Sequence, residues 1–322
     1  METCKKTFLL PSQMKKNFCV LACLLCFSMV GVVHSEENIE HLGEGPHEGS
    51  QDHEGGGSNG TNEEQPPKNK QEKIKELAIQ VQNPISDLVR FGFTNFLEFG
   101  SGPTNSNINI FNLNASTTRQ FGQWSLLNRL VVPLLYLPES VPDASSGDSG
   151  RSFGLGDIEY TAFLVRDESK RVLKSIVGIG PTIIFKSATD DRMGLGKWSV
   201  GPSMAIARMQ YPWVHGVVLR NIWSFAGDSD RPKVNFFLIQ PFVNYNFTNG
   251  WYLTSTPGII ANWEADSRDQ WTVPIGGGIG KLLFRGDKHP VNLKLQSFYF
   301  LEKPDIGPDW SLNFEFRILF PQ

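Results

Sequence analysis

The side chains best suited to chemistry in this chain are charged residues that interrupt strongly apolar runs. In a β-strand, alternate side chains point to opposite faces, so such charges share the face that the apolar side chains leave. If the apolar face contacts lipid, the opposite face lines a lumen, because an Arg or Lys facing lipid at mid-membrane costs about 2–4 kcal/mol. The candidate lumen-lining residues are Arg90, Glu98, Arg129, Asp157, Glu159, Lys186, Arg220, Glu264, Lys294, Glu315 and Arg317.

These candidates carry both signs of charge, which leaves two interpretations open. Ion pairs can brace a wall, or the charges can contact a solute in a pore without strong ion selectivity. A structural ion-pair network is the simpler interpretation of mixed charges, and a substrate site is the alternative.

Catalytic readings find little support. Nucleophilic hydrolysis needs a His beside a Ser and an acid or amide, and His215 and His289 could meet Ser224 or Ser297 by composition alone. The glycines at 276–280 precede Lys281, yet a phosphate loop needs a Gly at position 275 and a Ser or Thr after the Lys. We therefore expect no catalytic residues, and we expect these glycines to bend a strand or to leave lumen space.

Acidic pairs at 190–191, 228–230 and 264–266 could bind calcium, or bridge lipopolysaccharide through divalent ions, although ordinary solvated loops contain the same residues. His41, His47 and His53 lie among acids, where a weak metal-binding tail and a solvated linker are both possible. No rigid ligand spacing is present. We expect no resident metal and no cofactor.

Residues 234–264, VNFFLIQPFVNYNFTNGWYLTSTPGIIANWE, predict two strands joined at 248–250. Asn-Gly between alternating runs is a strong hairpin signal because both residues tolerate positive φ. Apolar side chains from Phe237 to Phe247 and from Trp251 to Trp263 alternate with polar ones such as Gln240 and Asn244. The apolar face begins and ends in aromatics about ten residues apart, as in a strand that crosses a bilayer between aromatic girdles.

Similar alternating runs fill the chain from residue 83 onward. The predicted strands are 87–100, 106–118, 123–135, 154–166, 173–187, 196–209, 213–226, 233–247, 250–264, 269–284, 289–301 and 309–320. An even number returns both ends of the barrel to one side, and the longest gap, 137–153, then falls among the outer loops. We predict an all-β, up-and-down antiparallel transmembrane barrel of about twelve strands, with a soluble β-sandwich as the rival fold.

The last predicted strand alternates from Trp310 to Phe320, with Glu315 and Arg317 on its polar face. A terminal amphipathic strand rich in aromatics is what a bacterial outer-membrane barrel presents to its assembly machinery. We therefore expect the barrel-assembly machinery, outer-membrane lipid and lipopolysaccharide as partners. The formal net charge of −3 gives no basic excess, so nucleic acid is not expected as a partner.

The sequence of residues 1–82 predicts export to the bacterial outer membrane. Residues 1–35 resemble a signal peptide, with Lys15 and Lys16 before an apolar core at 18–33, and all four cysteines lie within it. Residues 36–70 are rich in Glu, Gly and Asn and predict a disordered linker. Residues 71–82 have apolar side chains at helical spacing and predict a short amphipathic helix that caps the barrel's mouth or enters it as a plug. The barrel domain is 83–322.

Several segments resemble bacterial outer-membrane proteins grouped as proposed transporters of the meta-pathway of phenol degradation, some of which carry the misleading label neuromedin U. These segments are FGLGDIEY, SATDDRMGLGKWSVGPS, WSFAGDSDR, QPFVNYNFTNGWYLTSTPGIIANWEADS, WTVPIGGGIGK and PVNLKLQSFYFLEKPDIGPDWSLNFEFRILFP. The resemblance covers most of 83–322 and implies an outer-membrane channel for small hydrophobic or aromatic solutes. A closed barrel with a structural or surface-interaction role is the alternative, and an outer-membrane lipid hydrolase is third.

Overall fold

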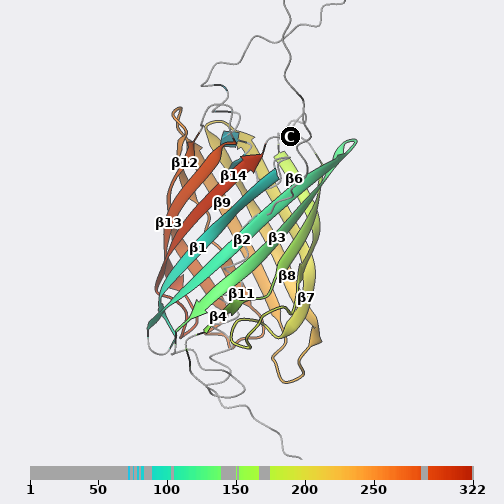
Figure 1. Cartoon of the computed structure of the whole chain (residues 1–322), viewed down its shortest axis with the longest axis vertical. Coiled ribbons are helices and arrows are strands. Elements are labelled where there is room, and N and C mark those ends of the chain that lie inside the picture. Colours follow the sequence, from blue (N-terminus) through green and yellow to red (C-terminus); the bar gives the residue numbers. More distant parts are fainter. Residues whose placement is uncertain are drawn as a thin grey trace, which may run out of the picture.

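The alternating runs of the sequence form strands in the computed structural model of the chain (Figure 1). The structure describes residues 89–102, 105–138, 150, 152–166, 175–283 and 289–320, together with residues 72, 75, 78, 79, 81 and 82. The predicted signal peptide at 1–35 and the predicted linker at 36–70 lie outside these residues. Within the described part, no helix is long and apolar enough to cross a membrane.

The strands are antiparallel to their neighbours throughout the sheet. Their bounds are β1 Val89–Ser101, β2 Ser106–Phe121, β3 Trp124–Leu137, β4 Ser152–Leu155, β5 Glu159–Arg166, β6 Ser175–Ile184, β7 Lys197–Gln210, β8 Trp213–Gly227, β9 Asn235–Asn246, β10 Trp251–Ser255, β11 Ile259–Asn262, β12 Trp271–Leu283, β13 Val291–Glu302 and β14 Trp310–Phe320.

These fourteen segments make a closed barrel that is twelve strands in circumference, and we call each of these twelve positions a stave. β4 and β5 both pair with β3 and form one stave, and β10 and β11 both pair with β9 and with β12 and form another. The sheet closes where β1 pairs with β14, from Val89 opposite Phe320 to Phe99 opposite Trp310. Closure pairs the first strand with the last, as a sheet in lipid requires, and β4, at one end of the barrel, has β3 as its one partner among the described strands. The predicted fold is confirmed.

Two staves predicted as continuous strands are interrupted, and in each case the backbone at the break cannot continue the ladder. Between β4 and β5, the N–H of Ile158 donates to a side chain, Ser187 Oγ at 2.8 Å, in place of a backbone carbonyl. Between β10 and β11, Pro257 has no N–H to donate. Both predicted spans, 154–166 and 250–264, were therefore too continuous.

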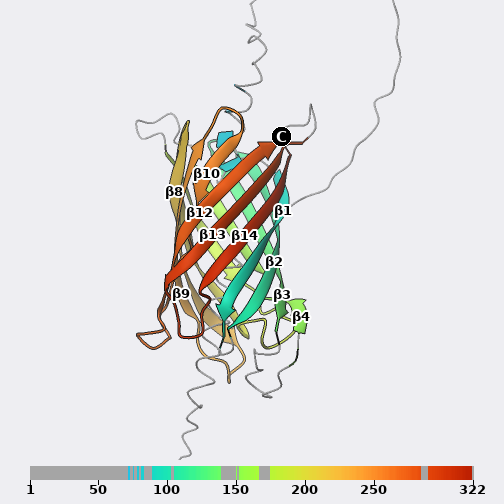
Figure 2. The same ribbon diagram turned by 90° about the vertical axis from the view of Figure 1, so that its left-hand side faces the viewer.

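The two ends of the barrel differ in the length of their connections. Connections 122–123, 167–174, 211–212, 247–250 and 284–290, of two to eight residues, lie at the end that also holds the start of β1 and the end of β14; we call it the turn end. Connections 138–151, 185–196 and 263–270 lie at the other end, the loop end. Figures 1 and 2 show the tilted strands with the C-terminus at the upper, turn end. Short turns are periplasmic and long loops external in outer-membrane barrels.

The outer surface carries exposed aromatic side chains in two bands. The turn-end band contains Phe121, Trp124, Trp213, Phe247 and Trp251, and the loop-end band contains Tyr136, Phe153, Trp198, Trp223, Trp263 and Trp310. Aromatic rings of this kind sit at the two membrane interfaces, where one edge contacts lipid and the other contacts water. The closed sheet and its two aromatic bands are those of a transmembrane β-barrel.

Candidate functional site

A cavity of about 130 Å³ lies inside the barrel at mid-height. Its wall takes one or more side chains from β1, β3, β5, β6, β7, β8, β9, β10, β13 and β14. The charged residues of this wall are Arg90, Arg129, Arg220, Lys294, Glu315 and Arg317. They come together because strand alternation points each of them inward at a similar level of its strand.

One carboxylate joins two of the arginines. Glu159, at the start of β5, is 1% exposed, and its Oε1 lies 2.7 Å from Arg220 Nη1 and 3.5 Å from Arg129 Nη1. Arg129 lies on β3 and Arg220 on β8, so this ion-pair group spans the staves between them. A buried carboxylate needs such partners, because an uncompensated charge there is strongly destabilising.

A second carboxylate joins two further cations. Glu315 Oε2 on β14 lies 2.9 Å from Lys294 Nζ and 2.7 Å from Arg317 Nη2. Asn292 Nδ2 donates to Glu315 Oε1 at 3.3 Å, and the hydroxyl of Tyr252 donates to Asn292 Oδ1 at 2.9 Å. This polar group therefore links β10, β13 and β14 across the inner wall.

Three hydroxyl side chains complete the polar level on the opposite wall. Thr182 Oγ1 lies 2.7 Å from Thr161 Oγ1 and 2.6 Å from Ser203 Oγ. All three hydroxyls are buried, and all three residues line the cavity. Ser203 is opposite Arg220 in the β7–β8 ladder, so the hydroxyl row ends on the strand next to that of Arg220.

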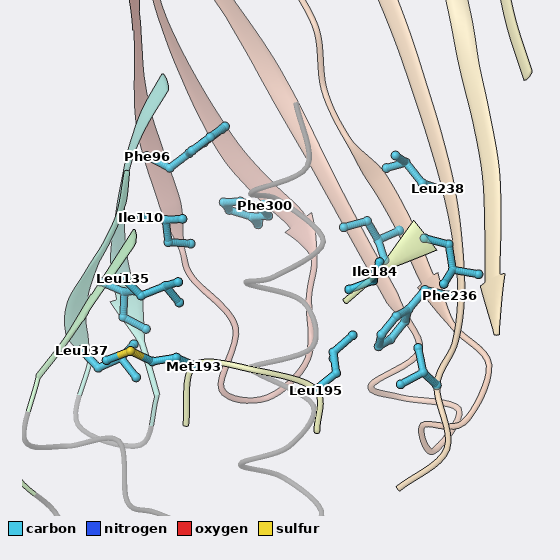
Figure 3. Close-up of a cluster of buried hydrophobic side chains, with 14 residues drawn as sticks. Phe96, Ile110, Leu135, Leu137, Ile184, Met193, Leu195, Phe236, Leu238 and Phe300 are labelled. Carbon is cyan, nitrogen blue, oxygen red and sulfur yellow. The ribbon is translucent and has the colours of Figure 1, made fainter. Parts of the chain in front are cut away.

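The loop end of the lumen is apolar. A cluster of buried side chains from most of the staves fills its inner face, and we call it the loop-end cluster; it consists of Phe96, Ile108, Ile110, Leu135, Leu137, Ile184, Met193, Leu195, Ile222, Val234, Phe236, Leu238, Ile260 and Phe300. Figure 3 shows side chains such as Ile110 and Leu135 on one side of the barrel facing others such as Ile184 and Leu238.

A smaller cavity of about 30 Å³ lies where the loop-end cluster meets the polar level. Its wall includes Phe96 and Ile260 of the cluster, and it shares Leu238, Lys294 and Glu315 with the central cavity. The apolar and polar parts of the lumen are therefore contiguous.

Helical residues of the N-terminal segment lie in the turn end of the lumen. Ala78 and Val81 are 4% and 2% exposed and pack with Leu282 and Leu319, which are inward-facing residues of β12 and β14. Gln82 and Asn246 exchange two amide hydrogen bonds of 2.6 and 3.0 Å. Val81 and Gln82 line the central cavity. Of the two sites that the sequence left open for this segment, the described positions occupy the one inside the barrel.

The remaining sequence candidates lie away from the cavity. Glu98 is fully buried near the loop end, and neither carboxylate oxygen has a hydrogen-bond partner among the described atoms. Asp157 lies in the break between β4 and β5, where it accepts backbone N–H groups of the 185–196 loop, including Leu195 N at 2.5 Å. Lys186 is exposed and pairs with Asp228, and Glu264 is exposed in the 263–270 loop. Lys186 and Glu264 therefore do not face the lumen.

The apolar lumen residues were missed by the sequence reasoning. Phe236, Leu238 and Phe242 stand at the same parity as Gln240 and Asn244, and all are buried. The face opposite lipid was inferred to be polar because its polar members stand out. Marking every inward position, whatever its side chain, would have found the apolar residues.

The groups considered for catalysis are dispersed. His215 is exposed at the start of β8, Ser297 is exposed on β13, and the hydroxyl of Ser224 accepts the N–H of Val234 at 3.0 Å. His289 is exposed and its ring lies 4.4 Å from that of Phe320. Within the described residues, no group of three or more His, Cys, Asp or Glu side chains is placed to hold a metal ion.

Comparison with known proteins places this arrangement among outer-membrane barrels. Residues 89–296 match the model of a family described by a proposed role in the MetA-pathway of phenol degradation. An outer membrane channel from Pseudomonas putida F1 is similar in structure, with a TM-score of 0.56 and 18% identity over 73% of this chain and 96% of that chain. This likeness establishes the fold. No curated protein matches the sequence.

Two weaker structural similarities carry no argument about function. The outer membrane phospholipase of Salmonella typhi, a dimer with bound calcium, has a TM-score of 0.38 and 11% identity over 77% of this chain and 97% of that chain. The CymD monoaromatic hydrocarbon channel has a TM-score of 0.37 and 10% identity over 77% of this chain and 91% of that chain.

Proposed function

The chain belongs to the family described by a proposed role in the MetA-pathway of phenol degradation, and from this premise we propose that it is an outer-membrane channel for small hydrophobic or aromatic solutes. The observation that carries the proposal is the loop-end cluster. A lumen serving ions or sugars is lined by polar groups, whereas this one presents buried Phe, Ile and Leu side chains where an external solute would enter.

The sizes of solute and cavity agree. An apolar cavity of about 150 Å³ holds one benzene ring, and the central cavity measures about 130 Å³. A single aromatic ring therefore matches the central cavity in size, whereas the loop-end cluster and the smaller cavity of about 30 Å³ must open to let it pass. The described part of the cavity wall gathers ion pairs and hydroxyls around this space.

The test is uptake of radiolabelled toluene by whole cells of a Gram-negative host that carries the mature protein in its outer membrane. Cells with the protein should take up toluene faster than cells with an empty vector. Leu238→Asn should slow uptake, because Leu238 lies in the loop-end cluster and in both cavity walls, and the amide adds a polar group at nearly constant volume. Glu264→Gln, in an exposed loop, is the matched control and should have no effect.

Equal toluene uptake with and without a folded, correctly inserted protein would overturn the channel and favour a closed barrel with a structural or surface role. The observation that favours this second function is the seating of the N-terminal helical residues against Leu282 and Leu319 in the turn end. Heat-modifiable gel migration establishes folding in each variant.

A further inference from the structure

The wall of the central cavity carries more positive than negative charge among the described residues. Five cationic side chains and one carboxylate line it, and Glu159 adds a second carboxylate through its ion pairs with Arg129 and Arg220. Each of the two carboxylates is thus shared by two cations. A guanidinium has five N–H donors in a planar fork, so one arginine can contact two carboxylates at the same time.

Directly beside this polar level, the same strands present an apolar one. Along β5 the inward residue after Thr161 is Phe163, and along β8 the inward residue beside Arg220 is Val218. Ala205 follows Ser203 along β7 in the same way. Two residues of strand span roughly 7 Å, which is close to the distance from the far edge of a benzene ring to an attached carboxylate.

We propose that the central cavity binds a small aromatic carboxylate of the size of benzoate. Its carboxylate accepts hydrogen bonds from Arg220 and from the hydroxyl row at Ser203, and its ring packs against Phe163 and Val218. This inference rests on the proposed function, because it takes the solute to be one that enters the lumen through the loop-end cluster. It adds a substrate class that an apolar lining by itself does not select.

The ion pairs of Glu159 predict how substitutions that remove a charge should change the affinity of the site for benzoate. Glu159 competes with a bound carboxylate for Arg129 and Arg220, so Glu159→Gln should tighten benzoate binding. Arg220→Gln should weaken binding roughly tenfold, since a hydrogen bond to a charged group contributes about 1.5–3 kcal/mol and 1.4 kcal/mol is a factor of ten. If these groups served the wall alone, neither variant would change the affinity for benzoate.

The experiment measures binding of benzoate and of benzyl alcohol, its neutral analogue, to the detergent-solubilised mature protein by isothermal titration calorimetry. Benzoate should bind more tightly than benzyl alcohol, and Arg220→Gln should remove that difference while leaving benzyl alcohol unchanged. Lys186→Gln is the matched control, because it removes one positive charge from the exposed 185–196 loop. Added salt should weaken the binding of benzoate more than that of benzyl alcohol.

Equal affinity for the two ligands, or a Glu159→Gln protein that binds benzoate more weakly, would overturn the carboxylate site. Toluene uptake separates this failure from that of the channel itself. Uptake that persists without any preference for benzoate leaves the channel standing and removes the site. Specific benzoate binding without toluene uptake retains the site and removes the channel for apolar solutes.

Discussion

Two carboxylates organise the charges at the centre of the lumen. Glu159 draws the side chains of Arg129 and Arg220 towards each other from β3 and β8, and Glu315 does the same for Lys294 and Arg317. In each group the acid is nearly inaccessible, with 1% and 2% exposure, whereas its cations border the cavity. The acids therefore position the cations, and the cations are the groups that a solute meets.

At the loop end, Asp190 holds the 185–196 loop against β4. Its carboxylate accepts from Arg192 Nε and Nη2 at 3.1 and 2.9 Å and from Ser152 Oγ at 2.8 Å, while Arg192 Nη1 donates to Gly150 O at 2.8 Å. The hydrogen bonds from Arg192 lower the pKa of Asp190 well below its ordinary range, against a smaller opposing effect of burial. This clamp connects a loop to the strand that precedes the first break in the wall.

The lowered pKa of Asp190 predicts how the loop responds to acid. A carboxyl whose pKa is depressed by folding contributes stability that is complete above its unfolded pKa of about 3.9 and is lost as the pH falls through the folded value. The backbone N–H of Arg192 also donates to Asp190 Oδ1, at 2.9 Å. Hydrogen exchange at this amide should therefore stay protected at pH 5 and at about pH 4, and should lose protection only in stronger acid. Asp190→Asn should expose this amide at neutral pH and flatten its pH dependence. Loss of protection already near pH 5 in the unchanged protein would contradict the clamp.

In the glycine-rich strand β12, the missing side chain of one glycine leaves room for an aromatic ring from the neighbouring strand. Gly280 is opposite Tyr252 in the β10–β12 ladder, and a Cβ at residue 280 would lie 2.0 Å from Tyr252 Cζ. The aromatic ring therefore lies flat over the glycine, and its hydroxyl reaches Asn292 on β13. Of the two roles expected for these glycines, Gly280 fulfils the one of leaving lumen space.

Gly280→Ala should displace Tyr252 and break its hydrogen bond to Asn292. We expect the free energy of unfolding to fall by about 1–3 kcal/mol, as for other overpacked sites. The measurement is urea unfolding in detergent micelles, followed by tryptophan fluorescence. Tyr252→Phe keeps the ring and removes the hydrogen bond alone, so it should cost less than Gly280→Ala. Equal losses in the two variants would show that the hydrogen bond, rather than the packing of the ring, is what the glycine provides.

The strands were predictable because their signal is local. A period of two in apolar side chains requires no knowledge of the rest of the chain, and it located every stave to within a few residues. The break between β4 and β5 was not predictable in this way, since it depends on Ser187, a residue on another connection. The pairing of Glu159 with both Arg129 and Arg220 was not predictable from local sequence either, because the curvature of the barrel decides which inward side chains meet.

The whole molecule has three levels along its axis. The loop end is apolar, the centre is charged and hydroxylated, and the turn end holds helical residues of the N-terminal segment. In the proposed channel, a solute that enters from outside would meet these levels in that order. The first two levels would select it, and the third, which lies between the cavity and the turn end, would control its release.

The apolar contact that holds the helical segment predicts that a single charge introduced there should open the turn end of the lumen. Val81 is 2% exposed and packs with Leu282 and Leu319. Val81→Asp would place an unpaired carboxylate in this apolar contact, so we expect the helical segment to leave the turn end of the lumen. The barrel keeps its closed ladder of backbone hydrogen bonds, because the segment contributes no strand to it.

Single-channel conductance in planar bilayers measures the result. Val81→Asp should conduct more than the unchanged mature chain, and Glu72→Gln, at an exposed position of the same segment, should match the unchanged chain. Removal of residues 36–82 should reproduce the higher conductance, because it takes away the whole segment and leaves the barrel domain. If Val81→Asp and the truncated chain both conduct no more than the unchanged chain, while both migrate as folded barrels on heat-modifiable gels, the narrowest point of the lumen lies elsewhere, and the loop-end cluster is then the level that limits passage.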